Sequence, residues 1–206
     1  MNKDLRIYLN WRRLRHIKRY NNFPVVNSMD VAQHSYYTTL LAMTLVDEWN
    51  SAAETKDIET IDAEMTLRKA LVHDSDESFT SDIPWNVKHM NEKIHKSIVK
   101  AINKKVKRLY KGCGVMKDYY LTAVESKSDY SGNIVNLADM LELCLFCWEE
   151  KQLGNSSLSG LLKKGLKIME GYPLYKELLD NSKFFSDTIK MLNSPLEDYS
   201  NMLEIE

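Results

Sequence analysis

Apolar residues recur at steps of three and four residues along most of the 206-residue chain, and this helical spacing constrains the fold more than any other feature. The clearest runs cover residues 31–49 and 134–148. Their inward positions are Val31, Ser35, Thr38, Leu41, Ala42, Leu45, Val46 and Trp49, and Ile134, Leu137, Leu141, Leu145 and Trp148. No stretch alternates polar and apolar residues as a half-buried strand does. The pattern predicts an all-α protein with seven or eight helices.

Helix ends are marked by a small number of glycines and prolines. The segments "KGCG", "SDYSGN", "LGNSS" and "GYPLY" separate predicted helices, and Ser28 or Asp30 is expected to cap the helix over residues 31–49. A chain of this length buries about 70% of its unfolded surface, so it needs no metal merely to fold. We expect one domain over residues 1–206, with a core at about 12–192 and a tail at about 193–206 that is a loose end or an interface strap.

The charge balance and the cysteines limit the class of protein. With 28 basic and 29 acidic residues the net charge is -1, which argues against a dedicated nucleic-acid binder and restricts any phosphate site to a local feature. Three cysteines form no even disulfide framework, and neither a signal-peptide core nor a membrane-length apolar run is found. We expect a soluble cytoplasmic protein, in the host cytoplasm if the source is viral, with no membrane partner.

Metal-type ligands occur on apolar helical faces at three places. His34 lies on the inward face of its helix, His73 and Asp74 end another helix, and Asp139 lies among apolar turn-neighbours. Taken singly, each has an ordinary explanation as a core histidine, a helix cap or a paired carboxylate. Taken together they form a mixed nitrogen and oxygen set. Such a set suits manganese, cobalt, nickel, zinc or iron(II) better than calcium, and magnesium also stays open.

The segments "VAQHS", "LVHDSDES", "TSDIP" and "NLADMLE" resemble the successive signatures of HD-domain metal-dependent phosphohydrolases, and most closely those of the bacterial 5'-deoxynucleotidase branch. The resemblance covers roughly residues 12–150. It implies an HD-type bundle of mostly antiparallel helices with the site between them. It also implies a nucleotide substrate and assembly into a homodimer or a higher homo-oligomer.

The resemblance assigns roles to particular positions. His34, His73, Asp74 and Asp139 match the four metal ligands, and Glu77 matches the acidic catalytic residue beside the metal. The positions implied to bind substrate are Arg19 near the phosphate, Thr80 and Asp82 in the loop near the sugar, and Tyr20, Ser35 and Lys88.

Three residues depart from the family pattern. Tyr20 stands where the family usually has tryptophan, Gln33 replaces a glutamate, and Ser81 replaces a glycine. None of these changes removes a metal ligand. An aromatic residue beside the sugar is a natural means of excluding a 2'-hydroxyl, so selectivity for deoxyribose is implied by likeness alone.

The matched residues fit phosphomonoester hydrolysis. If its helix persists, Glu77 shares a face with His73 and Asp74 and is placed to orient water or to carry its proton. Arg19 offers a fork of donors for phosphate oxygens, and Lys88 a point charge. For both cations, ordinary surface exposure stays the alternative.

Two other features have plainer explanations. The segment "CLFC" places Cys144 and Cys147 at zinc-like spacing, but without a second pair it predicts core packing. The segment "KSIVKAINKKVKRLYKG" predicts an amphipathic helix with a solvated cationic side, and a minority interpretation is that it attracts anionic nucleotides or a polyanion.

Three functions are therefore weighed. The first is metal-dependent hydrolysis of (deoxy)nucleoside 5'-monophosphates to nucleoside and phosphate. The second is an HD-type triphosphohydrolase acting on deoxynucleoside triphosphates, like the viral dATPases. The third is an inactive HD module that binds a nucleotide.

Overall fold

The computed structural model describes residues 2–56, 58–84, 87, 90–124 and 129–195, and all regular structure within these ranges is helical. Nine α-helices of seven residues or more occur there, together with the four-residue helix α4 (Glu77–Thr80). The longer ones are α1 (Lys3–Trp11), α2 (Val31–Lys56), α3 (Ala63–Val72), α6 (Glu92–Leu109), α7 (Val115–Val124), α8 (Tyr130–Gln152), α9 (Ser159–Met169), α10 (Tyr175–Asn181) and α11 (Lys183–Asn193). Two short 3-10 helices, η1 (Arg12–His16) and η2 (Ser156–Leu158), complete the set. The all-α prediction is confirmed.

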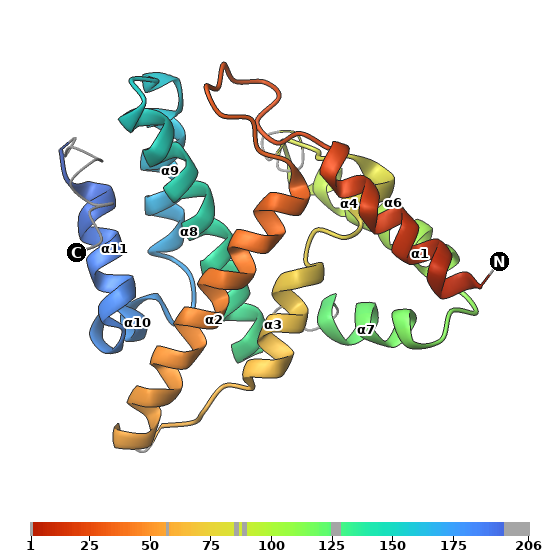
Figure 1. The fold of residues 1–206 in the computed structure, drawn as a ribbon, viewed down its shortest axis with the longest axis horizontal. Coiled ribbons are helices and arrows are strands. Elements are labelled where there is room, and N and C mark those ends of the chain that lie inside the picture. The colour runs from red at the N-terminus through yellow and green to blue at the C-terminus, as the bar shows by residue number, and fades with distance from the viewer. Residues whose placement is uncertain (1, 57, 85–86, 88–89, 125–128, 196–206) are drawn as a thin grey trace, which may run out of the picture.

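The long helices α2 and α8 form the centre of the bundle. Helix α2 packs against α3 and α8, and α8 packs in turn against α9 (Figure 1). Helices α10 and α11 cover one end, and α1, α6 and α7 lie at the other end, so the described parts of the two chain ends are far apart. Cys144 and Cys147 are fully buried in the main core, which confirms that this cysteine pair is a packing feature.

Side-chain caps explain where several helices begin. Asp30 Oδ1 accepts from the backbone N–H of Gln33, and the Gln33 side-chain oxygen accepts from the backbone N–H of Asp30, which completes a capping box at the start of α2. Of the two expected cap residues, Ser28 and Asp30, Asp30 is therefore the one that caps α2. Ser182 caps α11 in the same way through Phe185 N–H and separates it from α10 without any glycine or proline. The boundary between α10 and α11 therefore cannot be found from the positions of glycine and proline.

A second, smaller core lies between α1, α6 and α7. It is formed by Ile7, Val106, Tyr110 and Tyr120. Packed residues therefore begin before residue 12. Helix α6 is amphipathic as predicted, with Val106 buried and Ile98, Ile102 and Leu109 half-buried, whereas Val99 is exposed.

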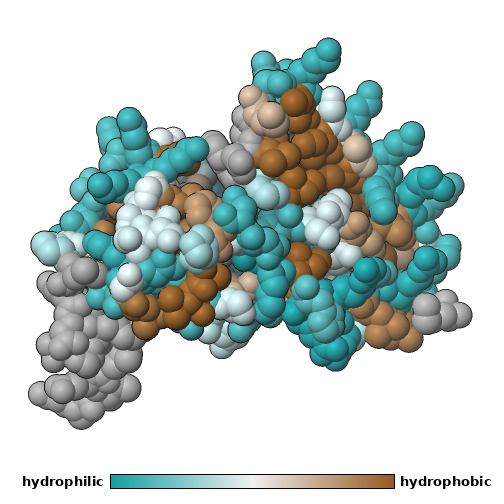
Figure 2. Space-filling view, turned by 90° about the horizontal axis from the view of Figure 1, so that it is seen from above, coloured by the Kyte–Doolittle hydropathy of each residue, from teal (hydrophilic) through white to brown (hydrophobic). Residues whose placement is uncertain are grey.

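Hydrophilic side chains cover most of the face seen in Figure 2, and the hydrophobic ones gather in separate patches. None of the helices in the described ranges combines the length and apolar character needed to cross a membrane. Residues 196–206 of the expected tail lie outside the described residues.

Candidate metal centre

Four side chains from three places in the chain meet where α2, α3 and α8 come together. Nε2 of His34 lies 3.2 Å from Nε2 of His73, 3.0 Å from a carboxylate oxygen of Asp139 and 3.6 Å from one of Asp74. Nε2 of His73 lies 3.3 Å from the same Asp74 oxygen. His73 is the residue that ends α3, and Asp74 follows in the turn, so two adjacent residues reach one point as expected at a helix end.

Both imidazole rings are held by their other nitrogen. Nδ1 of His34 is hydrogen-bonded to the buried carboxylate of Glu142, and Nδ1 of His73 lies 2.7 Å from the carbonyl oxygen of Ala70. These partners fix Nδ1 as the donor, so the lone pair of each Nε2 turns to the meeting point. This is the usual arrangement behind metal-binding histidines. Sequence reasoning missed Glu142: its place one turn after Asp139 on an apolar helix marks it as an inward carboxylate, but only the packing of α2 against α8 shows its partner.

The electrostatics of the meeting point favour a positive charge. Burial alone would lower the pKa of His73, but the neighbouring carboxylates Asp74 and Asp139 raise it to about 9. Burial would raise the pKa of Asp139, but hydrogen bonding and attraction to His34 lower it to about 2. A divalent cation would take the place of the proton on His73, and the two imidazole nitrogens with two ionised carboxylates then form a donor set that fits it.

Arg19 reaches the same place from the loop before α2. Its Nη1 lies 3.0 Å from the Asp74 carboxylate, and its side chain is largely buried. Burial alone would lower the pKa of the guanidinium, but nearby groups including Asp74 raise it above its usual value, so Arg19 stays charged. The backbone N–H of Arg19 donates to the Met29 carbonyl at 3.0 Å, which closes the loop behind it.

The loop that carries Arg19 is fastened to α8 by a buried glutamate. The Glu150 carboxylate accepts hydrogen bonds from the backbone N–H groups of Val26 and Asn27, both at 2.7 Å, and from the Asn155 amide at 2.6 Å. Glu150 is fully buried. A carboxylate in that setting is stable only with such donors, so it sets the position of the loop against the bundle.

A cavity of about 570 Å³ opens beside the meeting point. Its lining includes the polar side chains of Arg19, Asp74, Glu77 and Asp139. Further lining residues come from α8, α9 and the loop after Tyr20, and include Phe23, Met140, Leu143, Leu161, Lys164 and Ile168. The size falls within the usual range for small-molecule sites, and the lining combines charged with apolar side chains.

A family model described as "5'-deoxynucleotidase YfbR-like" matches residues 7–191. The chain belongs to this YfbR-like family of HD-domain phosphohydrolases.

Individual relatives agree with this membership. A 5'-deoxynucleotidase of Shewanella oneidensis is 28% identical over 169 residues, which cover 78% of this chain and 82% of the relative. An HD-domain phosphohydrolase from Listeria innocua has a similar structure, with a TM-score of 0.72 at 20% identity over 91% of this chain and 90% of that one. A cyanophage S-2L HD phosphohydrolase, solved with dA and one catalytic Zn²⁺ ion, has a TM-score of 0.56 at 18% identity over 89% of this chain and 96% of that one.

Tyr20 is one of the three departures from the family pattern, and it lines the cavity together with Arg19. Its ring stacks on Phe146 with the centroids 4.4 Å apart, and its backbone has a φ of 58°, which an aromatic residue rarely adopts. Its hydroxyl is buried and has no hydrogen-bond partner among the described residues. Backbone strain of this kind is concentrated at functional sites.

Glu77 reaches the cavity by a route other than the expected one. Helix α3 does not persist beyond Val72; a tight turn follows, and the Glu77 N–H donates to the Asp74 carbonyl at 3.0 Å. Glu77 then begins α4, and its largely buried side chain lines the cavity. The turn brings Glu77 beside Asp74 although the two residues do not share one helix.

Only some of the other residues predicted to contact substrate line the cavity. Asp82 lines the cavity. Thr80 and Ser35 are not among the lining residues of this cavity. The Thr80 hydroxyl donates within its own turn to the Asp76 carbonyl at 3.3 Å. The buried Ser35 hydroxyl donates to the Val31 carbonyl at 2.9 Å. Lys88 lies outside the described residues. The substrate roles of these four residues stay predictions.

The Ser81 departure falls on an unusual backbone position. Ser81 follows α4 with a φ of 63° and a ψ of 168°, a conformation that glycine adopts far more readily than serine. This conformation accounts for the expectation of a glycine here, and in this chain a serine adopts it.

Proposed function

We propose that this chain hydrolyses (deoxy)nucleoside 5'-monophosphates to nucleoside and inorganic phosphate, with one divalent ion held by His34, His73, Asp74 and Asp139. The observation that carries the proposal is the convergence of these four side chains beside a cavity that Arg19, Asp74, Glu77 and Asp139 line. The name and coverage of the Shewanella relative support the same reaction.

Each group has a task that its position suits. A divalent ion bound there supplies charge neutralisation for the phosphate and lowers the pKa of water toward neutrality. Arg19 binds and orients phosphate oxygens through its fork of donors. Glu77 holds the attacking water and takes its proton. Glu77 then passes this proton on, through solvent water, to the departing 5'-oxygen, so the protons balance over the reaction.

The apolar side chains of the cavity provide room for the nucleoside. Phe23, Leu143 and Ile168 offer surfaces for the base, and Tyr20 lines the same cavity directly after Arg19 in the sequence. We propose that the Tyr20 ring packs against the sugar and disfavours a 2'-hydroxyl. Asp82 is placed on the same cavity to accept a hydrogen bond from a sugar hydroxyl.

A second candidate is hydrolysis of deoxynucleoside triphosphates at the same centre. The observation in its favour is Lys164, a further cationic side chain that lines the cavity from α9. Two more phosphates need such neutralising charge. An inactive nucleotide-binding module is the third candidate, and the retention of all four metal-type ligands speaks against it.

Product analysis on a panel of nucleoside mono- and triphosphates, run with several divalent ions, tests the proposal. We expect orthophosphate and nucleoside from monophosphates, with deoxyribonucleotides preferred. Asp139→Ala serves as the matched inactive control. Tripolyphosphate released from a triphosphate would favour the second candidate, and no turnover of any monophosphate would overturn the first.

A further inference from the structure

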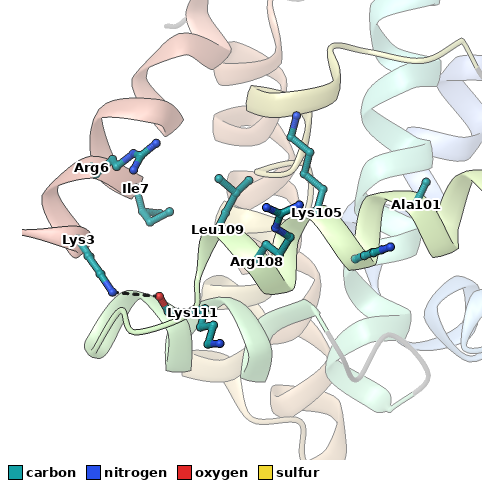
Figure 3. A pocket seen from close by; sticks show the side chains of 9 residues that line it. Lys3, Arg6, Ile7, Ala101, Lys105, Arg108, Leu109 and Lys111 are labelled. Carbon is teal, nitrogen blue, oxygen red and sulfur yellow. Dashed lines mark hydrogen bonds between the residues drawn. The ribbon is translucent and has the colours of Figure 1, made fainter.

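A second cavity, of about 670 Å³, lies between α1 and α6 and shares no lining residue with the cavity at the metal centre. Six of its nine lining residues are cationic: Lys3, Arg6, Lys104, Lys105, Arg108 and Lys111. Figure 3 shows Arg6 on α1 and Arg108 on α6 on opposite sides of this cationic cleft, with Lys105 extending upward from α6. The family reaction proposed above makes no use of it.

The positive charge of the cationic cleft is not balanced locally. Helix α6 carries seven lysines and arginines but one acid, Glu92, which pairs with Lys96 at the far end of the helix. The one acid of α1, Asp4, accepts instead from the backbone N–H groups of Gly114 and Met116. Within the described ranges, Arg6, Lys105 and Arg108 form no ion pair.

A concentration of like charges at one place in a chain with a net charge of -1 needs an explanation. Neighbouring cations that face one cavity repel one another, and a bound anion relieves that repulsion. Lysines that spread over a convex, solvated surface repel one another much less. At the end of the molecule where α1, α6 and α7 lie, hydrophilic side chains project along the edge in Figure 2.

The cleft rests on packed residues rather than on loops. Ile7 and Leu109 form its floor, and Ile7 is 2% exposed because it packs with Val106 and Tyr110 in the smaller core. The cations on α1 and α6 therefore flank a small core to which both helices contribute a buried side chain, Ile7 from α1 and Val106 from α6. This arrangement suits a binding site that exists before its ligand arrives.

Lys3 at the start of α1 contacts the turn after α6. Its Nζ donates to the Lys111 carbonyl at 3.5 Å, drawn as a dashed line in Figure 3. The next residue, Gly112, has a φ of 78°, a backbone conformation that favours glycine. A cavity of about 670 Å³ suits a compact ligand better than a long strand.

We propose that the cationic cleft binds a compact polyphosphate, either free or as the phosphate arm of a nucleotide. Several adjacent phosphate groups match several converging cations, and the apolar floor leaves room for a ring. A nucleic-acid strand shares the phosphate chemistry but not the compact shape. The site stands apart from the metal centre, so it holds or fails independently of the proposed hydrolysis.

Calorimetric titration of the metal-loaded protein with sodium tripolyphosphate tests the proposal. The test variant is Arg6→Glu with Arg108→Glu, and the matched control is Lys163→Glu with Lys167→Glu, which changes the net charge equally on exposed positions of α9. We expect the cleft variant to lose at least about tenfold in affinity for one binding event and the control to retain it. Asp139→Ala should also retain tripolyphosphate binding at the cationic cleft, because the cleft lies away from the metal centre.

Equal tripolyphosphate binding by the wild type and the cleft variant would overturn the proposal, as would loss of all binding in Asp139→Ala alone. The milder pair Arg6→Gln with Arg108→Gln should give an intermediate loss, which guards against a folding defect in the charge reversal. Tighter binding of dATP than of tripolyphosphate would identify a nucleotide ligand, and equal binding a free polyphosphate. Much tighter binding of a long single-stranded oligonucleotide through Arg6 and Arg108 would replace the compact ligand with a nucleic acid and overturn the proposal.

Discussion

The buried carboxylate of Glu142 on α8 is hydrogen-bonded to Nδ1 of His34 on α2, across 108 residues of sequence. This bond turns Nε2 of His34 toward His73 and makes Glu142 the support of one metal ligand rather than a ligand itself. Partners of this kind typically contribute 10- to 100-fold in metal affinity or activity.

Replacing Glu142 with alanine should therefore weaken metal binding by roughly 10- to 100-fold, because the His34 ring loses the partner that fixes its orientation. Glu142→Gln should restore most of the affinity, since an amide oxygen also accepts from Nδ1–H. Competition with a metal chelator measures both. Unchanged affinity in Glu142→Ala would remove this residue from the account.

Glu77→Gln should leave the metal content near that of the wild type and lower the hydrolytic rate by roughly 10²-fold, because it removes a proton acceptor but no ligand. Metal analysis and steady-state phosphate release on the same preparation measure the two effects. Glu64→Gln, an exposed acid on α3, is the matched control. A full rate in Glu77→Gln would contradict the assigned role.

The four metal-type ligands were predictable from sequence because each is a chemically distinctive residue inside an apolar helical pattern or at its end. Glu142 and Glu150 were not assigned, because their roles depend on which segments lie against α8, and periodicity along one helix carries no such information. The position of Glu77 beside Asp74 was expected from a helix that continues past Asp74, and this helix ends earlier. The turn after Val72 replaces a continued helix, and no glycine or proline marks that break.

Tyr20→Phe should leave the fold intact or stabilise it by up to about 1 kcal/mol, because the hydroxyl it removes is buried without a partner among the described residues. If the hydroxyl contacts the sugar, the same change should alter the ratio of kcat/KM for deoxyribo- and ribonucleotides. Urea unfolding and paired kinetics measure these effects. A marked loss of stability together with unchanged selectivity would contradict the role given to Tyr20.

Glu150→Gln should destabilise the protein at pH 7 by about 2 kcal/mol, because the amide cannot accept from both backbone N–H groups and the Asn155 amide at once. It should also lower kcat/KM, since the loop that carries Arg19 and Tyr20 loses its fastening. Urea unfolding gives the first quantity, and Glu170→Gln, at an exposed position of the same chain, is the control.

The stability difference between the wild type and Glu150→Gln should depend on pH. Burial would raise the pKa of Glu150, but the donors at Asn27, Val26 and Asn155 lower it below its ordinary value of 4.5. A carboxyl whose pKa is lowered by folding stabilises the protein above its unfolded pKa and loses that contribution as the pH falls through the folded value. The difference should therefore shrink below about pH 4.5. A constant difference from pH 7 to pH 3 would contradict this.

The central claim is that His34, His73, Asp74 and Asp139 together hold one divalent ion. Elemental analysis of the protein after equilibrium dialysis against a divalent ion measures this directly, with Asp139→Ala dialysed in parallel. The account predicts about one ion per wild-type chain and a large loss in the variant. A wild-type chain that holds no ion, or an Asp139→Ala chain that keeps a full equivalent, would contradict it.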